Sequence, residues 1–140
     1  MRRRIAREIA IRTLYQIDLN KESVDTALEF VQKESFDYEI TEDIKKFSGE
    51  LVSGVLEHLD QIDMVIVNTA KEWSISRMNP VDRNIIRVAI YEILYTKESI
   101  SVAMAINEAV ELARDYGEGD SQKFVNGVLG NIIESMKLTE

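Results

Sequence analysis

The apolar residues of this 140-residue chain recur at α-helical spacing over nearly its whole length, and one proline interrupts them. In the first segment Ile5, Ile9 and Leu14 fall on one face of such a helix. Helices are expected from Arg3 to about Leu19, from Ser23 or Val24 to Gln32, from a Thr41 N-cap to Leu59, from Ile62 to Trp73, from Pro80 through Leu94, from Ser101 to Gly117, and from Asp120 or Ser121 through Ile133. About seven helices joined by short turns predict an all-α fold.

Pro80 marks a boundary inside this pattern. The residue before a proline is steered away from the α region, and proline itself suits the first position of a helix. The helix that begins there is apolar over much of its girth, with Ile85, Val88 and Ala89, which is typical of a central buried helix. We therefore expect a single domain over residues 1–140, which the polar 74–80 link can divide into halves 1–76 and 77–140.

The composition disfavours catalysis and metal binding. The chain has no cysteine and only one histidine, His58, which sits near the end of an acidic helix, where it suits the negative end of the helix dipole. Acidic pairs such as Glu42 and Asp43 fall on faces expected to be solvated, and neither GxxxxGK[ST] nor GxGxxG occurs. We predict no enzyme activity, no cofactor and no metal site. No apolar run approaches the roughly 20 residues of a membrane span, so a cytoplasmic location is expected.

The charge is distributed very unevenly. Residues 1–12 hold five arginines and one glutamate, a local charge of +4 on a chain of net charge −8, so the remainder carries −12. A basic arm on an acidic body is typical of a protein with two partners, one anionic and one cationic. Charge alone equally allows a solubilising terminus and a solvated acidic face.

Two helix starts carry groups that suit RNA. One is the arm itself, because arginine offers forked donors to phosphates and a flat face to bases. The other is the turn from Gly117 to Phe124, which presents hydroxyl, ammonium and aromatic groups within one helical turn. The alternative for this turn is purely structural: a helix C-cap followed by an N-cap, with Phe124 in the core.

Four long blocks of the sequence resemble the NusB family of bacterial transcription antitermination factors. RRRIAREIAIRTLYQID (2–18) is similar to the arginine-rich first helix of that family. VDRNIIRVAIYEIL (81–94), INEAVELARDYG (106–117) and DSQKFVNGVLGNI (120–132) are similar to its three C-terminal signatures, in the same order and spacing. Residues 20–60 match weakly. Gly130 departs from the charged residue usual there, and a glycine inside a helix costs about 1 kcal/mol relative to alanine.

The resemblance implies a fold of two small packed helical bundles, without catalysis. It also implies binding to the single-stranded boxA element of nascent leader RNA together with the ribosomal protein NusE, within an RNA polymerase antitermination complex on ribosomal RNA operons. The implied RNA contacts are Arg2, Arg3, Arg4, Arg7, Tyr15, Asp120, Ser121, Lys123 and Phe124. The implied partner surface includes Asp82 and Tyr91. The alternative function is a helical scaffold that binds only proteins and makes no RNA contact.

Overall fold

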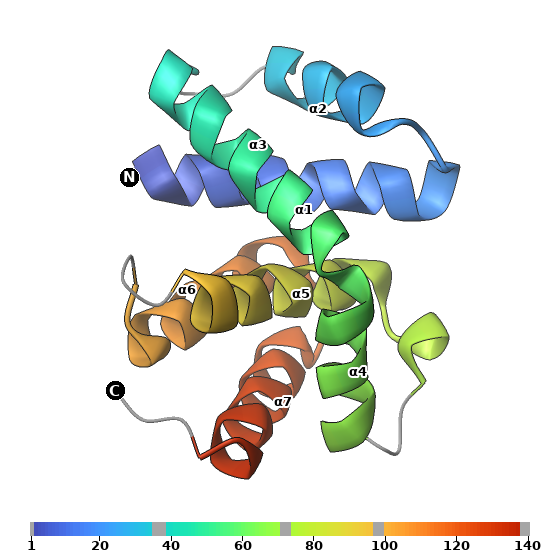
Figure 1. The fold of residues 1–140 in the computed structure, drawn as a ribbon, viewed down its shortest axis with the longest axis vertical. Helices are drawn as coiled ribbons and strands as arrows, with labels where there is room; N and C mark the ends of the chain where they lie inside the picture. Colours follow the sequence, from blue (N-terminus) through green and yellow to red (C-terminus); the bar gives the residue numbers. More distant parts are fainter. Residues whose placement is uncertain (1, 35–38, 71–73, 97–99, 138–140) are drawn as a thin grey trace.

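The computed structural model describes residues 2–34, 39–70, 74–96 and 100–137. These residues form seven α-helices and one short 3-10 helix, with no strand among them (Figure 1), so the all-α prediction is confirmed. The helices are α1 (Arg2–Asn20), α2 (Val24–Lys33), α3 (Glu42–Glu57), α4 (Leu59–Thr69), η1 (Ile75–Arg77), α5 (Pro80–Tyr95), α6 (Val102–Tyr116) and α7 (Ser121–Ser135).

Capping side chains explain several helix starts. The Ser23 hydroxyl accepts a hydrogen bond from the Thr26 backbone N–H, and the Ser101 hydroxyl accepts one from Met104. The Asn79 side chain accepts from the backbone N–H of Val81 at 2.8 Å, which places Pro80 at the first position of α5. These starts agree with the residues that the sequence predicted as boundaries.

Two predicted boundaries differ from the structure: α3 ends at Glu57, and α4 ends at Thr69 with Ala70 as its C-cap. We expected a helix to Leu59 and another from Ile62 to Trp73, but the chain bends at His58, which ends α3 and immediately precedes α4. The His58 ring is stacked on Tyr95, with ring centroids 3.9 Å apart, so it packs on α5 instead of only facing solvent. Trp73 lies outside the described residues.

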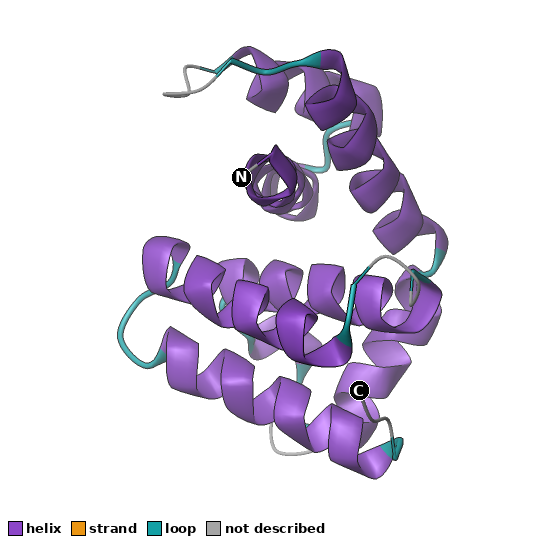
Figure 2. Cartoon of the chain, turned by 90° about the vertical axis from the view of Figure 1, so that its left-hand side faces the viewer, coloured by secondary structure: helices purple, strands orange, loops and turns teal. Residues whose placement is uncertain are grey.

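The helices pack in two groups that meet at α1 and α5. Helix α1 packs against α2 and α3 on one side and against α5 on the other, and Figure 2 shows it end-on between the two groups. Helix α4 packs on α5 and α7. Through these contacts α4 belongs with α5 and α7, so the chain passes from one group to the other at His58. Ile62 and Ile66 of α4 are buried in the main core cluster, to which α1, α3, α5 and α7 also contribute.

Helix α5 is buried along most of its length, as predicted, but its buried residues include charged ones. Glu92 is paired with Arg7 of α1, Nε to Oε2 at 2.8 Å and Nη2 to Oε1 at 2.9 Å. Arg83 donates twice to Asp18 of α1, at 2.9 and 2.7 Å. The hydrophobic pattern could not show these pairs, because each joins residues that are far apart in the sequence.

The Arg7–Glu92 pair gives a stability prediction. Removing one partner of a buried ion pair leaves the other charge unpaired, so Arg7→Met should lower the free energy of unfolding by about 3–5 kcal/mol. The double variant R7M/E92M should recover much of that loss, because neither charge then remains buried. Urea unfolding of both variants measures the effect. Lys33→Ala, in an exposed ion pair with Glu29, is the control and should cost at most about 1 kcal/mol.

Two helical glycines differ in what surrounds them. A Cβ built on Gly54 of α3 would lie 2.2 Å from the Tyr91 ring of α5, so the absent side chain lets these two helices approach closely. A Cβ on Gly130 of α7 would meet no atom within 4 Å, and α7 continues through this position to Ser135. The departure at Gly130 therefore leaves the packing of the last turns intact.

These glycines predict opposite effects of the same substitution. Gly54→Ala should destabilise the protein by about 1–3 kcal/mol, because the added methyl group overpacks the contact between α3 and α5. Gly130→Ala should stabilise it by about 1 kcal/mol, since alanine is the better helix former and the site is open. Thermal unfolding followed by circular dichroism compares both with the parent. Equal shifts of the same sign would contradict the assigned contacts.

Candidate nucleic-acid interface

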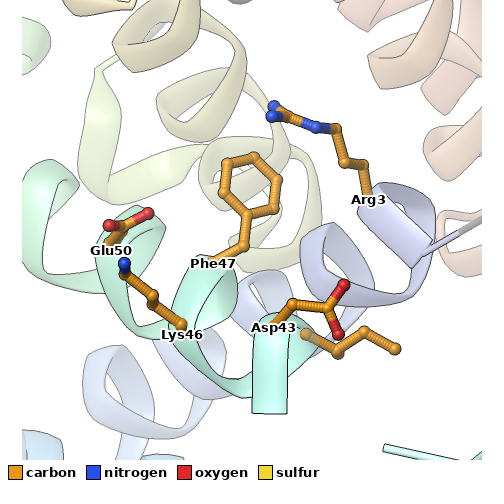
Figure 3. Close-up of a pocket in the computed structure, with 6 residues that line it drawn as sticks. Arg3, Asp43, Lys46, Phe47 and Glu50 are labelled. Carbon is orange, nitrogen blue, oxygen red and sulfur yellow. The ribbon is translucent and has the colours of Figure 1, made fainter. Parts of the chain in front are cut away.

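The arm predicted from the sequence is the first part of α1, which begins at Arg2. Arg3 is exposed, and its guanidinium carbon lies 4.5 Å from the centre of the Phe47 ring of α3. Figure 3 shows the Arg3 guanidinium above the Phe47 ring, and both residues line a surface pocket together with Lys46 and Glu50. A cation on the face of a ring is held without losing its charge, so Arg3 still presents a positive group to solvent.

Arg4 lies on the side of α1 that faces α6. Its Nη1 donates to Glu111 at 2.8 Å and its Nη2 to Asp115 at 3.1 Å. Burial lowers the pKa of Arg4, but the hydrogen bonds and charges of these acids and of Glu108 raise it overall. Arg4 thus keeps its positive charge, and the nearby carboxylates of α6 offset that charge.

Arg7 was predicted as an RNA contact, and the structure places it elsewhere. Its side chain is 6% exposed and forms the buried pair with Glu92 described above. One helical turn beyond Arg3, this position faces α5 and not solvent. Arg7 therefore supports the position of the arm but does not present its charge at the surface.

Tyr15 borders a groove between α1, α2 and the end of α6. Tyr15 is 37% exposed, and the groove is also lined by the aromatic side chains of Phe30 and Tyr116. The Tyr116 hydroxyl donates to Glu8, and burial together with this carboxylate raises the pKa of Tyr116. Sequence reasoning missed Phe30, which is 54% exposed. The available indication was that Phe30 does not belong to the face of α2 that buries Ala27 and Val31.

The turn between α6 and α7 is held by its own residues. A Cβ on Gly117 would lie 2.4 Å from Ser121 Cβ, and Gly119 has a φ of +51°, so both positions favour glycine. The Ser121 hydroxyl accepts from Glu118 N–H at 3.0 Å and donates to Glu118 C=O at 2.8 Å. Asp120 occupies the N-cap position without a capping hydrogen bond from its side chain. Ser121 is buried and acts inside the turn, whereas Asp120 is exposed.

Lys123 and Phe124 point to different environments. Phe124 is half-buried and packs against the main core cluster, as the structural alternative for this turn predicted. Lys123 is exposed and lines a groove between α6 and α7 that Asn107 also borders. Asn107 donates to Glu111 at 3.0 Å, and Glu111 is one of the acids that hold Arg4.

The two residues predicted for the partner surface lie far apart on α5. Asp82, in the first turn, is 6% exposed and lines a pocket with Arg77 and Phe124. Its Oδ1 is buried without a hydrogen-bond partner, and burial raises its pKa while the Ser121 hydroxyl opposes that shift. Tyr91, more than two turns further on, packs over Gly54 and lies 6.2 Å from the His58 ring. These residues do not form one compact patch.

The described part of the chain contains no group of three or more His, Cys, Asp or Glu side chains arranged to hold a metal ion. None of its helices is both long and apolar enough to cross a membrane. The features brought together are an arginine-bearing helix, two grooves and a glycine-containing turn on a helical framework. They define a small all-helical protein whose surface combines these features.

Comparison with known proteins identifies the family. The model of the NusB family matches residues 4–134. The transcription antitermination protein NusB of an Exiguobacterium species is 45% identical over 134 residues, covering 96% of this chain and 98% of that protein. NusB of Bacillus subtilis is 45% identical over 132 residues, covering 94% of this chain and 95% of the relative. The chain belongs to the NusB family.

Solved structures agree with this assignment. NusB of T. maritima has a TM-score of 0.83 and 34% identity, covering 94% of this chain and 90% of the other. A structure described as antitermination factors NusB and NusE in complex with double-stranded RNA has a TM-score of 0.83 and 29% identity, covering 96% and 97%. A chain from a structure described as a plectonemic RNA supercoil has a TM-score of 0.89 and 29% identity, covering 100% and 99%.

The raised pKa of Asp82 predicts a pH-dependent stability difference. A carboxyl whose pKa is higher in the folded state lowers the free energy of unfolding as pH rises above its ordinary pKa of about 3.9. Asp82→Asn should therefore be more stable than the parent at pH 7, and this advantage should shrink at pH 4. Urea unfolding at both pH values measures it.

Asp60, exposed in the first turn of α4, provides the matched control. Asp60→Asn should lower stability at pH 7 by about 0.3–1 kcal/mol, because it only removes a favourable charge from a helix start. A loss of stability in Asp82→Asn equal to that in the control would contradict the burial penalty at Asp82.

Proposed function

We propose that this protein is a transcription antitermination factor that binds the boxA element of nascent leader RNA together with NusE and promotes processive transcription of ribosomal RNA operons. One observation carries the proposal: the chain matches, over 96% of its length, the fold of a NusB that has been solved with NusE and RNA. Its role is binding without catalysis, in the cytoplasm, as part of an RNA polymerase complex.

The charge distribution supports two partners. RNA phosphates suit the exposed cations Arg3 and Lys123, while unstacked bases suit the exposed ring of Tyr15. A ribosomal protein supplies the cation that an acidic body of charge −12 favours. The proposed RNA surface includes Arg2, Arg3, Arg4, Tyr15, Asp120, Lys123 and Phe124, and the proposed NusE surface includes Asp82 and Tyr91.

The proposal is tested by titrating a labelled single-stranded boxA RNA with the protein, alone and with NusE, at several salt concentrations. We expect weak binding alone, tighter binding with NusE, and an affinity that falls as salt rises. A scrambled RNA and a double-stranded boxA RNA are the controls for sequence and strandedness. NusE binding with no detectable RNA binding would support the scaffold alternative instead.

Lys123 distinguishes an RNA role of the α6–α7 turn from a structural one. Lys123→Ala should weaken boxA binding and reduce the magnitude of the salt slope by about one unit, because about one phosphate contact is lost. Its thermal stability should stay near that of the parent, since the side chain is exposed. Lys33→Ala, on α2, removes the same charge elsewhere as a control. Binding curves of Lys123→Ala that overlay those of the parent at every salt concentration would exclude this contact.

A further inference from the structure

The Arg4 guanidinium already donates to carboxylate oxygens through both of its terminal nitrogens, the groups that would bind a phosphate. Its Nη1 and Nη2 face oxygens of Glu111 and Asp115, at 2.8 and 3.1 Å, and Glu108 lies 3.7 Å from Nη1. Two terminal nitrogens thus meet two oxygens, as they would meet two oxygens of one phosphate group. The carboxylates and an RNA phosphate would use the same donors.

Burial separates this cluster from the neighbouring Arg7 pair. The side chains of Arg4, Glu111 and Asp115 remain 22%, 34% and 44% exposed. Those of Arg7 and Glu92 are 6% and 3% exposed. Solvent and a competing anion can therefore reach Arg4, whereas releasing Arg7 would leave a charge buried without a partner.

The carboxylates of α6 are not needed to hold that helix in place. Helix α6 packs against α5 and α7 through its buried residues Ala105, Ala109, Leu112 and Ala113. Ion pairs that solvent still reaches contribute little to stability compared with such apolar packing. The half-buried Glu111 and the exposed Asp115 can therefore exchange their partner while α6 stays where it is.

We propose that Glu111 and Asp115 compete with RNA phosphate for Arg4 and thereby set the RNA affinity of the free protein. This inference rests on the proposed RNA-binding function. An RNA strand that reaches Arg4 must displace two carboxylates or approach against their negative charge. The acids limit non-specific binding of polyanions, and a specific RNA held at its other contacts can still replace them.

The test compares E111Q/D115N with the parent and with a control of equal charge, E29Q/E134Q, which removes two exposed acids from α2 and α7. At low salt E111Q/D115N should bind labelled boxA RNA about three- to tenfold more tightly than the parent, and the control less than about twofold. Circular dichroism verifies that every variant keeps its helix content.

A third variant isolates the route through Arg4. In R4A/E111Q/D115N the gain should disappear, because the cation that the acids mask is absent. If the gain in RNA affinity persists without Arg4, it comes from the loss of two negative charges in general and not from releasing Arg4, and the proposal is overturned. Weaker binding by E111Q/D115N than by the parent would also overturn it, since the acids would then position Arg4 for RNA.

Heparin serves as a second probe that does not depend on RNA recognition. The same order of affinities is expected with heparin, with E111Q/D115N above the parent and the control. If boxA RNA fails to bind any variant with NusE present while heparin shows this order, the proposed function fails and the competition stands. If E111Q/D115N and E29Q/E134Q have the same affinity for both probes, the proposed competition between the α6 acids and RNA phosphate is wrong.

Discussion

The structure depends on the charged residues buried in α5. Taking a charge out of water costs several kcal/mol unless a partner and hydrogen bonds compensate it, so Arg83, Arg87 and Glu92 need partners from other helices, whereas the raised pKa of Asp82 reflects its burial. Helix α1 supplies Arg7 and Asp18, and α4 supplies Asp63, whose two oxygens accept from Arg87 at 2.9 Å each. These pairs fix how α1 and α4 lie across α5, and the two helical groups are joined there.

This constraint also shapes the surface proposed for RNA. Helix α1 must turn apolar residues and Arg7 inward to pack on α5, so the arginines of its first two turns have different surroundings. Arg3 is exposed over Phe47, Arg4 is paired with partly exposed acids of α6, and Arg7 is locked inside. A cluster that looks uniform in the sequence is thus graded by burial, and the charge available to a phosphate is smaller than a count of arginines indicates.

The α6–α7 turn shows how a functional and a structural role share one segment. Gly117, Gly119 and Ser121 build the turn through close approach, a positive φ and two hydrogen bonds to Glu118. Lys123 is exposed on the first turn of the helix that follows. Both interpretations of the sequence therefore apply here: the structural one to Ser121, the RNA-binding one, as a proposal, to Asp120 and Lys123, and both to the half-buried Phe124.

The sequence alone determined the helical class, most helix boundaries and the family resemblance, because apolar spacing, Pro80 and capping residues act over a few neighbouring positions. The break at His58 and the packing of α4 with α5 and α7 were decided by tertiary structure. So were the burial of Arg7, the separation of Asp82 from Tyr91 and the pairing of Arg4 with α6. These features depend on contacts between residues tens of positions or more apart, and local spacing carries no information about which distant charge a side chain will meet.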